Sequence, residues 1–117
     1  VMIKDNHIQV AGGIKEAVGA IRSKIPKSIK IEVETSNLEQ VQEALDADVD
    51  IIMLDNMSSK LMKEAVQLIN GRAKIEASGN MTLKRIRKVA STGVNYISIG
   101  ALTHSVKALD ISQRIIH

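Results

Sequence analysis

Cysteine is absent from this sequence, and its absence removes several classes of site. Without thiols the chain forms neither disulfides nor thiolate metal centres, and the composition fits a reducing compartment, so we expect the cytoplasm. Aromatic residues are nearly absent too, because Tyr96 is the only one. The core must therefore be aliphatic. No apolar run approaches the roughly 20 residues that a membrane helix needs.

Strong charge of one sign is also missing. The 16 basic and 13 acidic residues give a net charge of +3, and Lys84–Lys88 is the one dense basic cluster, which we interpret as a solvated helix face. With no aromatic residues interleaved to stack on bases, the sequence argues against nucleic-acid binding. The three histidines lack metal-ligand spacing, which argues against a zinc site.

What the sequence does contain is a repeated pattern in which a short β-rich run precedes an amphipathic segment. Regular alternation of this kind predicts parallel strands joined by right-handed crossovers. We therefore predict an α/β fold, the C-terminal part of a (β/α) TIM-like barrel that is incomplete in this chain. The predicted strands are 1–4, 29–34, 50–55, 74–78 and 95–100, and the predicted helices are 14–24, 38–47, 60–70 and 83–92.

The first and last residues of the chain lead to two further predictions. The apolar opening Val1–Ile3 resembles a strand entered midway, so we expect a fragment of a longer protein. We assign residues 1–107 to a partial barrel domain and 108–117 to a C-terminal tail. Within the tail, alternation predicts an extended strand over Leu109–Ile115 that leaves the barrel, although a helix through Val106, Leu109 and Gln113 remains an alternative.

Side-chain alternation along the predicted strands indicates where a site would form. If the face that ends in Glu34, Asp55, Ser78 and Gly100 lines the barrel, polar groups collect at its C-terminal mouth, and Lys4 joins them. Barrel active sites are built at that mouth. Each carboxylate alone is more often a solvated strand end or a helix cap. We interpret Lys30, Glu32, Lys74 and Glu76, which precede these residues on the same face, as a paired structural network in the barrel interior.

Glycine-containing turns follow the last two predicted strands. Small residues in Ser78–Asn80 and Gly100–His104 let backbone N–H groups approach an anion, and a helix N-terminus after each turn would add a favourable dipole. Glycines after strands mostly serve turns, but paired loops after late barrel strands frequently hold a phosphate. The sequence thus predicts a phosphate site shared by the two turns.

Five ordered motifs and the end of the chain resemble one enzyme family. The sequence is similar over its whole length to quinolinate phosphoribosyltransferase, also called nicotinate-nucleotide pyrophosphorylase (carboxylating), although it covers less than half of that family's usual length. Asn80 stands where many relatives carry a second glycine. The matching segments are 2–8 (MIKDNHI), 31–34 (IEVE), 52–57 (IMLDNM), 76–80 (EASGN), 98–105 (SIGALTHS) and 108–112 (ALDIS).

The resemblance implies a reaction and a set of site residues. The family transfers a phosphoribosyl group from phosphoribosyl pyrophosphate to quinolinate with decarboxylation, giving nicotinate mononucleotide, pyrophosphate and CO2 for NAD biosynthesis. Lys4 would face the quinolinate carboxylates and the pyrophosphate. Glu34 and Asp55 would hold the ribose hydroxyls and stabilise positive charge on the ribose. Mg2+ would accompany the pyrophosphate and reach these carboxylates through waters, with no direct protein ligand. The 5′-phosphate would be held by Ser78, Gly79, Asn80, Gly100 and His104.

The resemblance also implies what this chain does not carry. The family's N-terminal sandwich domain and first barrel strands, which grip quinolinate, have no counterpart here, and the family's site borrows an arginine from a partner subunit. We therefore expect the isolated fragment to be inactive and the full-length enzyme to be a homodimer or higher homo-oligomer. Two alternatives stay open, namely a molybdenum-transport-associated homologue of the same fold and a non-catalytic phosphate-binding half-barrel. Asn6 and His7 belong to the first motif, but their roles are not assigned.

Overall fold

A single sheet forms the centre of the computed structural model, which describes residues 1–99 and 104–108. Its strands lie in the order in which they occur along the chain, and β1 to β5 are parallel, whereas β6 pairs with β5 in the antiparallel sense. The strands are β1 (Met2–Ile3), β2 (Glu32–Thr35), β3 (Ile51–Asp55), β4 (Lys74–Ser78), β5 (Tyr96–Ile99) and β6 (His104–Lys107).

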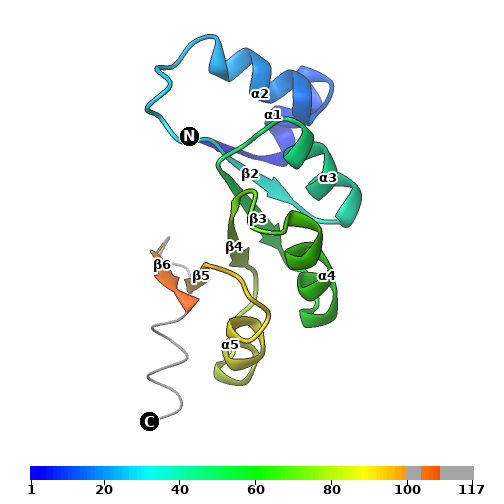
Figure 1. Ribbon diagram of the computed structural model, residues 1–117, viewed down its shortest axis with the longest axis vertical. Helices are drawn as coiled ribbons and strands as arrows, with labels where there is room; N and C mark the ends of the chain where they lie inside the picture. Colours follow the sequence, from blue (N-terminus) through cyan, green and yellow to red (C-terminus); the bar gives the residue numbers. More distant parts are fainter. Residues whose placement is uncertain (100–103, 109–117) are drawn as a thin grey trace.

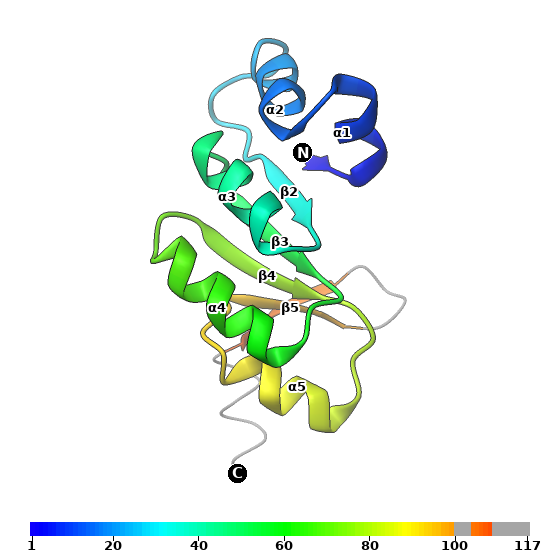
Figure 2. The same cartoon turned by 90° about the vertical axis from the view of Figure 1, so that its right-hand side faces the viewer.

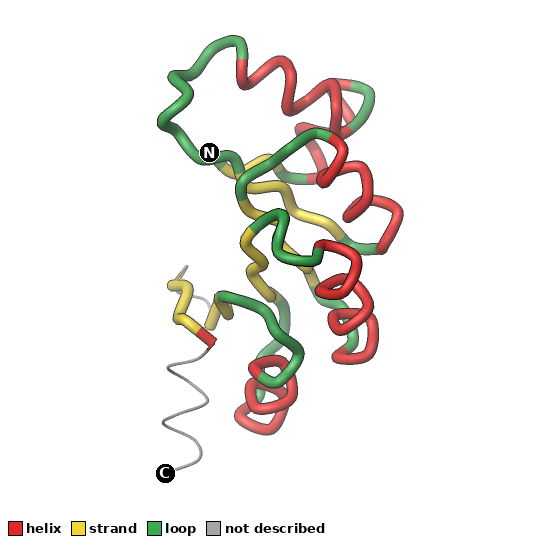
Figure 3. The backbone as a smooth tube through the Cα atoms, viewed as in Figure 1, coloured by secondary structure: helices red, strands yellow, loops and turns green. Residues whose placement is uncertain are grey.

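The five helices of the described residues flank the same side of the sheet (Figure 1), and the tube of Figure 3 shows strands on one side and helices on the other. The helices after β2, β3 and β4 begin at residues whose side chains accept from the first turn: Asn37 from Gln40 N–H, Ser58 from Leu61 N–H and Thr82 from Arg85 N–H. The helices are α1 (Asp5–Ala11), α2 (Ile14–Arg22), α3 (Leu38–Asp46), α4 (Ser59–Ile69) and α5 (Leu83–Ala90).

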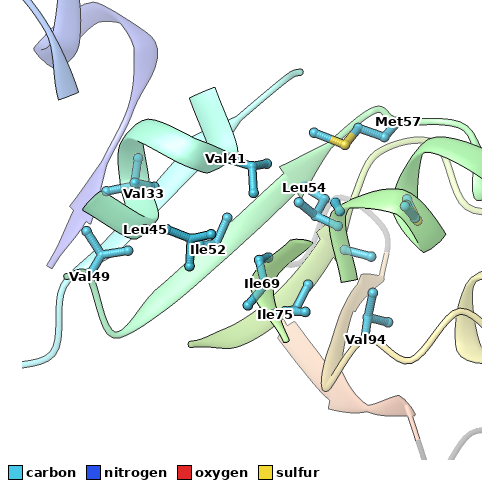
Figure 4. Close-up of a cluster of buried hydrophobic side chains, with 14 of the residues drawn as sticks. Val33, Val41, Leu45, Val49, Ile52, Leu54, Met57, Ile69, Ile75 and Val94 are labelled. Atoms are coloured by element: carbon cyan, nitrogen blue, oxygen red, sulfur yellow. The ribbon is translucent and has the colours of Figure 1, made fainter. Parts of the chain in front are cut away.

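The hydrophobic core lies between the sheet and the helices (Figure 4). Val33, Ile52 and Ile75 from successive strands meet Val41, Leu45 and Ile69 from α3 and α4, and Ile31 and Val33 are both 0% exposed. Because successive side chains of a strand point to opposite faces, the residues between these apolar positions lie on the other face. We call that other face, which no described helix covers, the open face. The predicted side-chain parity is therefore confirmed.

The sequence did not predict two of the elements. No element was predicted over α1, and β6 lies where a helix was expected after the second glycine turn. In addition, β2 begins at Glu32 rather than at Ile29, because Ile29 N–H donates to Pro26 O in a turn that leaves Ile29 41% exposed. The predicted strand over Leu109–Ile115 lies outside the described residues. Over residues 1–99 and 104–108, no helix combines the length and the hydropathy needed to cross a membrane.

Candidate active site

The carboxyl ends of the parallel strands bring together four of the predicted site residues. Lys4 directly follows β1, Glu34 lies near the end of β2, and Asp55 and Ser78 end β3 and β4. Asp55 and Ser78 are register partners, and Glu34 is the register partner of Met53, two residues before Asp55. Glu34, Asp55 and Ser78 therefore lie on the open face at one end of the sheet, the end at which the loops leading to α3, α4 and α5 begin (Figure 2).

The pKa of Glu34 responds to Asp55 and Lys4, which shows that these charged groups lie close to one another. Burial raises the pKa of the Glu34 carboxyl above its usual value, and repulsion from Asp55 and from Asp5 raises it further, while the Lys4 ammonium opposes the shift. A carboxylate pair beside a lysine is suited to bind hydroxyl groups and to stabilise positive charge on a ligand. Sequence analysis had not included Asp5, which becomes part of this environment because it begins α1 immediately after Lys4.

The turn at Lys4 is fixed by a residue whose role the sequence left open. The backbone N–H of Lys4 donates to His7 Nδ1 at 3.2 Å, and the N–H of His7 donates to Lys4 O at 3.0 Å. The N–H of His7 also donates to Asn6 Oδ1 at 3.0 Å. His7 and Asn6 thus shape the start of α1 and hold the backbone of Lys4 at the strand end. No sequence pattern marks this contact, because it depends on a helix that the sequence did not predict.

The Ser78–Asn80 turn packs against the loop that follows Asp55. The Asn56 N–H donates to Ser78 O at 2.9 Å, and Gly79 has φ of 135°. A Cβ on Gly79 would lie 3.2 Å from Asn56 Cα, so only glycine fits without displacing one of the loops. Asn56 itself has φ of 54°. These backbone restraints hold the candidate phosphate loop directly beside Asp55.

A second layer of polar groups lies one step below the site on the open face. Ser98 Oγ donates to Glu76 Oε2 at 2.6 Å, and Glu32 of β2 lies near enough to Glu76 for the two carboxyl groups to interact. Burial, followed by repulsion from Glu76, raises the pKa of Glu32 to about 7. Two members of the predicted interior network, Glu32 and Glu76, therefore do interact on the open face. The other two, Lys30 and Lys74, are exposed, so the prediction that lysines pair with these carboxyls in the interior was wrong.

The second predicted glycine turn is placed only in part. Gly100 lies outside the described residues, and His104 begins β6, where it is the register partner of Ile99. Because an antiparallel strand rather than a helix starts at His104, the helix dipole expected there is not supplied by residues 104–107. The Ser78–Asn80 turn, by contrast, does lead to α5, which begins at Leu83.

Within the part of the chain that the structure covers, no group of three His, Cys, Asp or Glu side chains could hold a metal ion. Glu34 and Asp55 alone fit a Mg2+ ion that keeps most of its waters, since Mg2+ is usually bound by one or two carboxylates together with substrate phosphates.

The predicted solvated basic cluster is confirmed in place, because Lys84, Arg87 and Lys88 are exposed. Lys84, Arg85 and Lys88 line a hollow of about 430 Å³ beside Ser58 and Thr82, outside the open face. Arg85 Nη2 also donates to Met57 O, which ties α5 to the loop after Asp55.

Comparison with known proteins places the chain among enzymes of one kind. The family model described as quinolinate phosphoribosyl transferase, C-terminal domain, matches residues 1–114. A probable nicotinate-nucleotide pyrophosphorylase (carboxylating) of Synechocystis is 52% identical over 119 residues, which cover 99% of this chain and 40% of that protein. A mitochondrial quinolinate phosphoribosyltransferase (decarboxylating) of Nicotiana tabacum is 49% identical over 133 residues, 98% of this chain and 38% of its own length. The chain thus spans about two fifths of these relatives.

Solved structures agree with this similarity. Nicotinate-nucleotide pyrophosphorylase from Ehrlichia chaffeensis superposes with a TM-score of 0.83 at 44% identity, over 89% of this chain and 38% of that one. The nicotinate-nucleotide pyrophosphorylase from Francisella tularensis superposes with a TM-score of 0.81 at 41% identity, over 91% of this chain and 38% of that one. Mandelate oxidase, at 16% identity and a TM-score of 0.64, shares the fold alone. The predicted fold class, part of a TIM-like barrel with parallel strands, is confirmed.

Proposed function

Since the chain belongs to the family of quinolinate phosphoribosyl transferase C-terminal domains, we propose that it supplies the phosphoribosyl-binding half of an active quinolinate phosphoribosyltransferase. The reaction joins the phosphoribosyl group of phosphoribosyl pyrophosphate to quinolinate, releases pyrophosphate and CO2, and gives nicotinate mononucleotide. The observation that carries the proposal is the meeting of Lys4, Glu34 and Asp55 at one end of the sheet beside the Ser78–Asn80 turn.

The two carboxylates act on the ribose. When pyrophosphate leaves, positive charge develops on the ribose ring, and carboxylates fixed beside it stabilise that charge more than they stabilise the neutral ground state. Glu34 and Asp55 also accept hydrogen bonds from the ribose hydroxyls. Lys4, held at the strand end by His7, offers its ammonium to the anionic substrate groups. Each of these steps uses a side chain of this chain.

The Ser78–Asn80 turn binds the 5′-phosphate. Because Gly79 has no side chain, the turn packs directly against Asn56, and its position beside Asp55 would set the distance between phosphate and ribose. Backbone N–H groups of such a turn can bind an anion. Gly100, which lies outside the described residues, and His104 are proposed to complete the phosphate site. Mg2+, brought in with the pyrophosphate, neutralises part of its charge, and Glu34 and Asp55 would hold its waters.

The quinolinate contacts, the oligomeric state and the cellular location are proposed from the family resemblance and the composition. Quinolinate would be bound by residues beyond this chain together with Lys4. We propose a homodimer or higher homo-oligomer, in keeping with the family resemblance, and a cytoplasmic location, in keeping with the absence of cysteine. Sedimentation of the full-length enzyme and cell fractionation would test these two points.

The experiment uses a full-length enzyme in which this sequence is joined to the additional residues that its relatives have. That enzyme is expected to form nicotinate mononucleotide from quinolinate and phosphoribosyl pyrophosphate. Glu34→Gln and Asp55→Asn should each lower kcat about 100-fold, with a smaller change in KM for phosphoribosyl pyrophosphate, because the charge matters most in the transition state.

The matched controls are Glu39→Gln and Asp46→Asn, which make the same chemical changes at exposed positions of α3. They should leave kcat unchanged. If the site variants raise KM as much as they lower kcat, the carboxylates act as ground-state ribose contacts. If the unmodified enzyme makes no product, the proposed function is wrong.

A further inference from the structure

Arg85 joins α5 to the loop of residues 56–58, which connects β3 to α4 and which we call the β3–α4 loop. Its Nη2 donates to Met57 O, 28 positions earlier in the sequence. Arg85 is partly buried, whereas the other cations of α5, which are Lys84, Arg87 and Lys88, are exposed and have no hydrogen-bond or ion-pair partner among the described residues. The guanidinium of Arg85 therefore has a structural contact that its neighbours on the helix lack.

A second hydrogen bond joins the same loop to the Ser78–Asn80 turn. The Asn56 N–H donates to Ser78 O at 2.9 Å. The chain then runs through the turn to Thr82, whose Oγ1 accepts from the Arg85 N–H at 3.2 Å. The β3–α4 loop, the turn and the start of α5 thus form a closed ring, in which the guanidinium contact is the link that Arg85 supplies. Removing that side chain opens the ring at one point.

The β3–α4 loop is restrained along its whole length, so a change at one end is passed on to the other. The side chain of Met57 is 2% exposed in the core, and Ser58 Oγ caps α4. Asn56 has φ of 54°, and Gly79 of the turn comes so close that a Cβ there would lie 3.2 Å from Asn56 Cα. Asp55 immediately precedes this loop. Movement of the loop would therefore shift the Asp55 carboxylate relative to the turn.

We propose that Arg85 is a positioning residue of the active site, which holds Met57 O and so fixes the separation between the Asp55 carboxylate and the Ser78–Asn80 turn. The inference deepens the proposed function and rests on it for the effect on catalysis. Arg85 acts through the β3–α4 loop rather than on the substrate, because it lines a hollow outside the open face, on which the candidate site lies. Catalytic groups must be held within about 0.5 Å of the productive geometry, and a misplacement of about 1 Å can cost about 100-fold in rate.

The kinetic test compares Arg85→Met with Lys84→Met in the full-length enzyme. Both variants lose one positive charge of α5 and keep the apolar part of the side chain, but only Arg85→Met loses the hydrogen bond to Met57 O. Arg85→Met should lower kcat about tenfold and change KM for phosphoribosyl pyrophosphate about twofold at most, because a misplaced carboxylate matters most in the transition state. Lys84→Met should behave like the unmodified enzyme. An unchanged kcat in Arg85→Met, or an equal loss in both variants, would overturn the proposal.

A double-mutant cycle tests whether Arg85 acts through the loop and the turn. Gly79→Ala disturbs the contact of the turn with the same loop from the other side. If both single variants act on one contact, each lowering kcat/KM about tenfold, the combined variant should lose about 20-fold rather than about 100-fold, since changes at coupled positions are not additive in free energy. A loss of about 100-fold or more would assign Arg85 an effect separate from the loop and overturn the proposal.

Amide hydrogen exchange separates this inference from the proposed function, because it needs no substrate. The Asn56 N–H, which donates to Ser78 O, should exchange about tenfold faster in Arg85→Met than in the unmodified enzyme or in Lys84→Met. Unchanged exchange in Arg85→Met would overturn the inference whatever the activity. If exchange is faster in Arg85→Met but the unmodified enzyme forms no nicotinate mononucleotide, the restraint of the loop by Arg85 is supported and the proposed function is wrong.

Discussion

The two faces of the sheet carry side chains of opposite polarity, although the same strands build both. On the helix-covered face, positions such as Val33, Ile52 and Ile75 are apolar and buried against α3 and α4. On the open face, the alternate positions are mostly charged or hydroxyl-bearing, and burial together with neighbouring carboxylates raises the pKa values of Glu32 and Glu34. The first face supplies the hydrophobic core and the second holds the residues of the proposed active site, so substitutions on the two faces should separate stability from activity.

The largest expected effect is a loss of stability from the helix-covered face. Leu54 is 0% exposed in the core, so Leu54→Ala should lower the free energy of unfolding by about 2–5 kcal/mol through lost burial and a residual cavity. Ile51, on the same strand but directed to the open face, is partly exposed, and Ile51→Ala should cost about 1 kcal/mol. Urea denaturation of the full-length variants measures both values. Equal losses would show that residues beyond this chain pack against the open face as tightly as the helices do.

How far the sequence predicted these two faces depends on the kind of signal. Alternation along a strand and capping residues such as Asn37 and Thr82 are local, so the parity of the sheet and the starts of α3 and α5 could be predicted. α1 could not, because its apolar contacts are limited to the partly buried Ile8 and Ala11, whereas Val10 is 91% exposed, so its hydrophobic pattern is weak.

Contacts within the candidate site were harder to predict than the fold. The hydrogen bond from Lys4 N–H to His7 Nδ1 depends on α1, and the contact of Glu32 with Glu76 depends on the register of three strands. Neither is encoded in a local pattern. The sequence placed Glu32 and Glu76 in an interior network, but it paired them with lysines, since a buried contact between two acids requires a raised pKa that only the packed sheet provides.

An intermediate effect is expected where the open face meets its loops. Gly79→Ala places a Cβ about 3.2 Å from Asn56 Cα in a backbone conformation that disfavours side chains, so the phosphate turn must move away from the loop after Asp55. We expect kcat/KM to fall about tenfold, mainly through KM for phosphoribosyl pyrophosphate, as a loss of about 1.4 kcal/mol of binding.

The matched control for Gly79→Ala is Gly19→Ala. Gly19 lies within α2, and no described atom lies within 4 Å of a Cβ built there, so alanine should leave kinetics unchanged and raise stability slightly. If Gly79→Ala alters stability but not KM for phosphoribosyl pyrophosphate, the turn is a structural element of the open face and not a phosphate site.

The smallest expected effect is a pH dependence of stability that originates on the open face. The pKa of Glu32 is raised from 4.5 to about 7, so the folded protein binds this proton more tightly than the unfolded chain does. The resulting stabilisation is fully present below pH 4.5 and is lost as pH rises through 7. Because Glu32 is only partly buried, solvent screens its interactions, and we expect the pH-dependent stabilisation to be about 1 kcal/mol. Urea denaturation at pH 5 and pH 8 should show this loss in the unmodified protein and not in Glu32→Gln.

The helix-covered face offers the control for this prediction. Ile52→Val removes a buried methylene there, at a cost of about 1 kcal/mol. It should lower the free energy of unfolding equally at both pH values, since no ionisable group is involved. A Glu32→Gln variant that keeps the full pH dependence would assign it to other carboxyls, of which Glu34, whose pKa is also raised, would be the first to test.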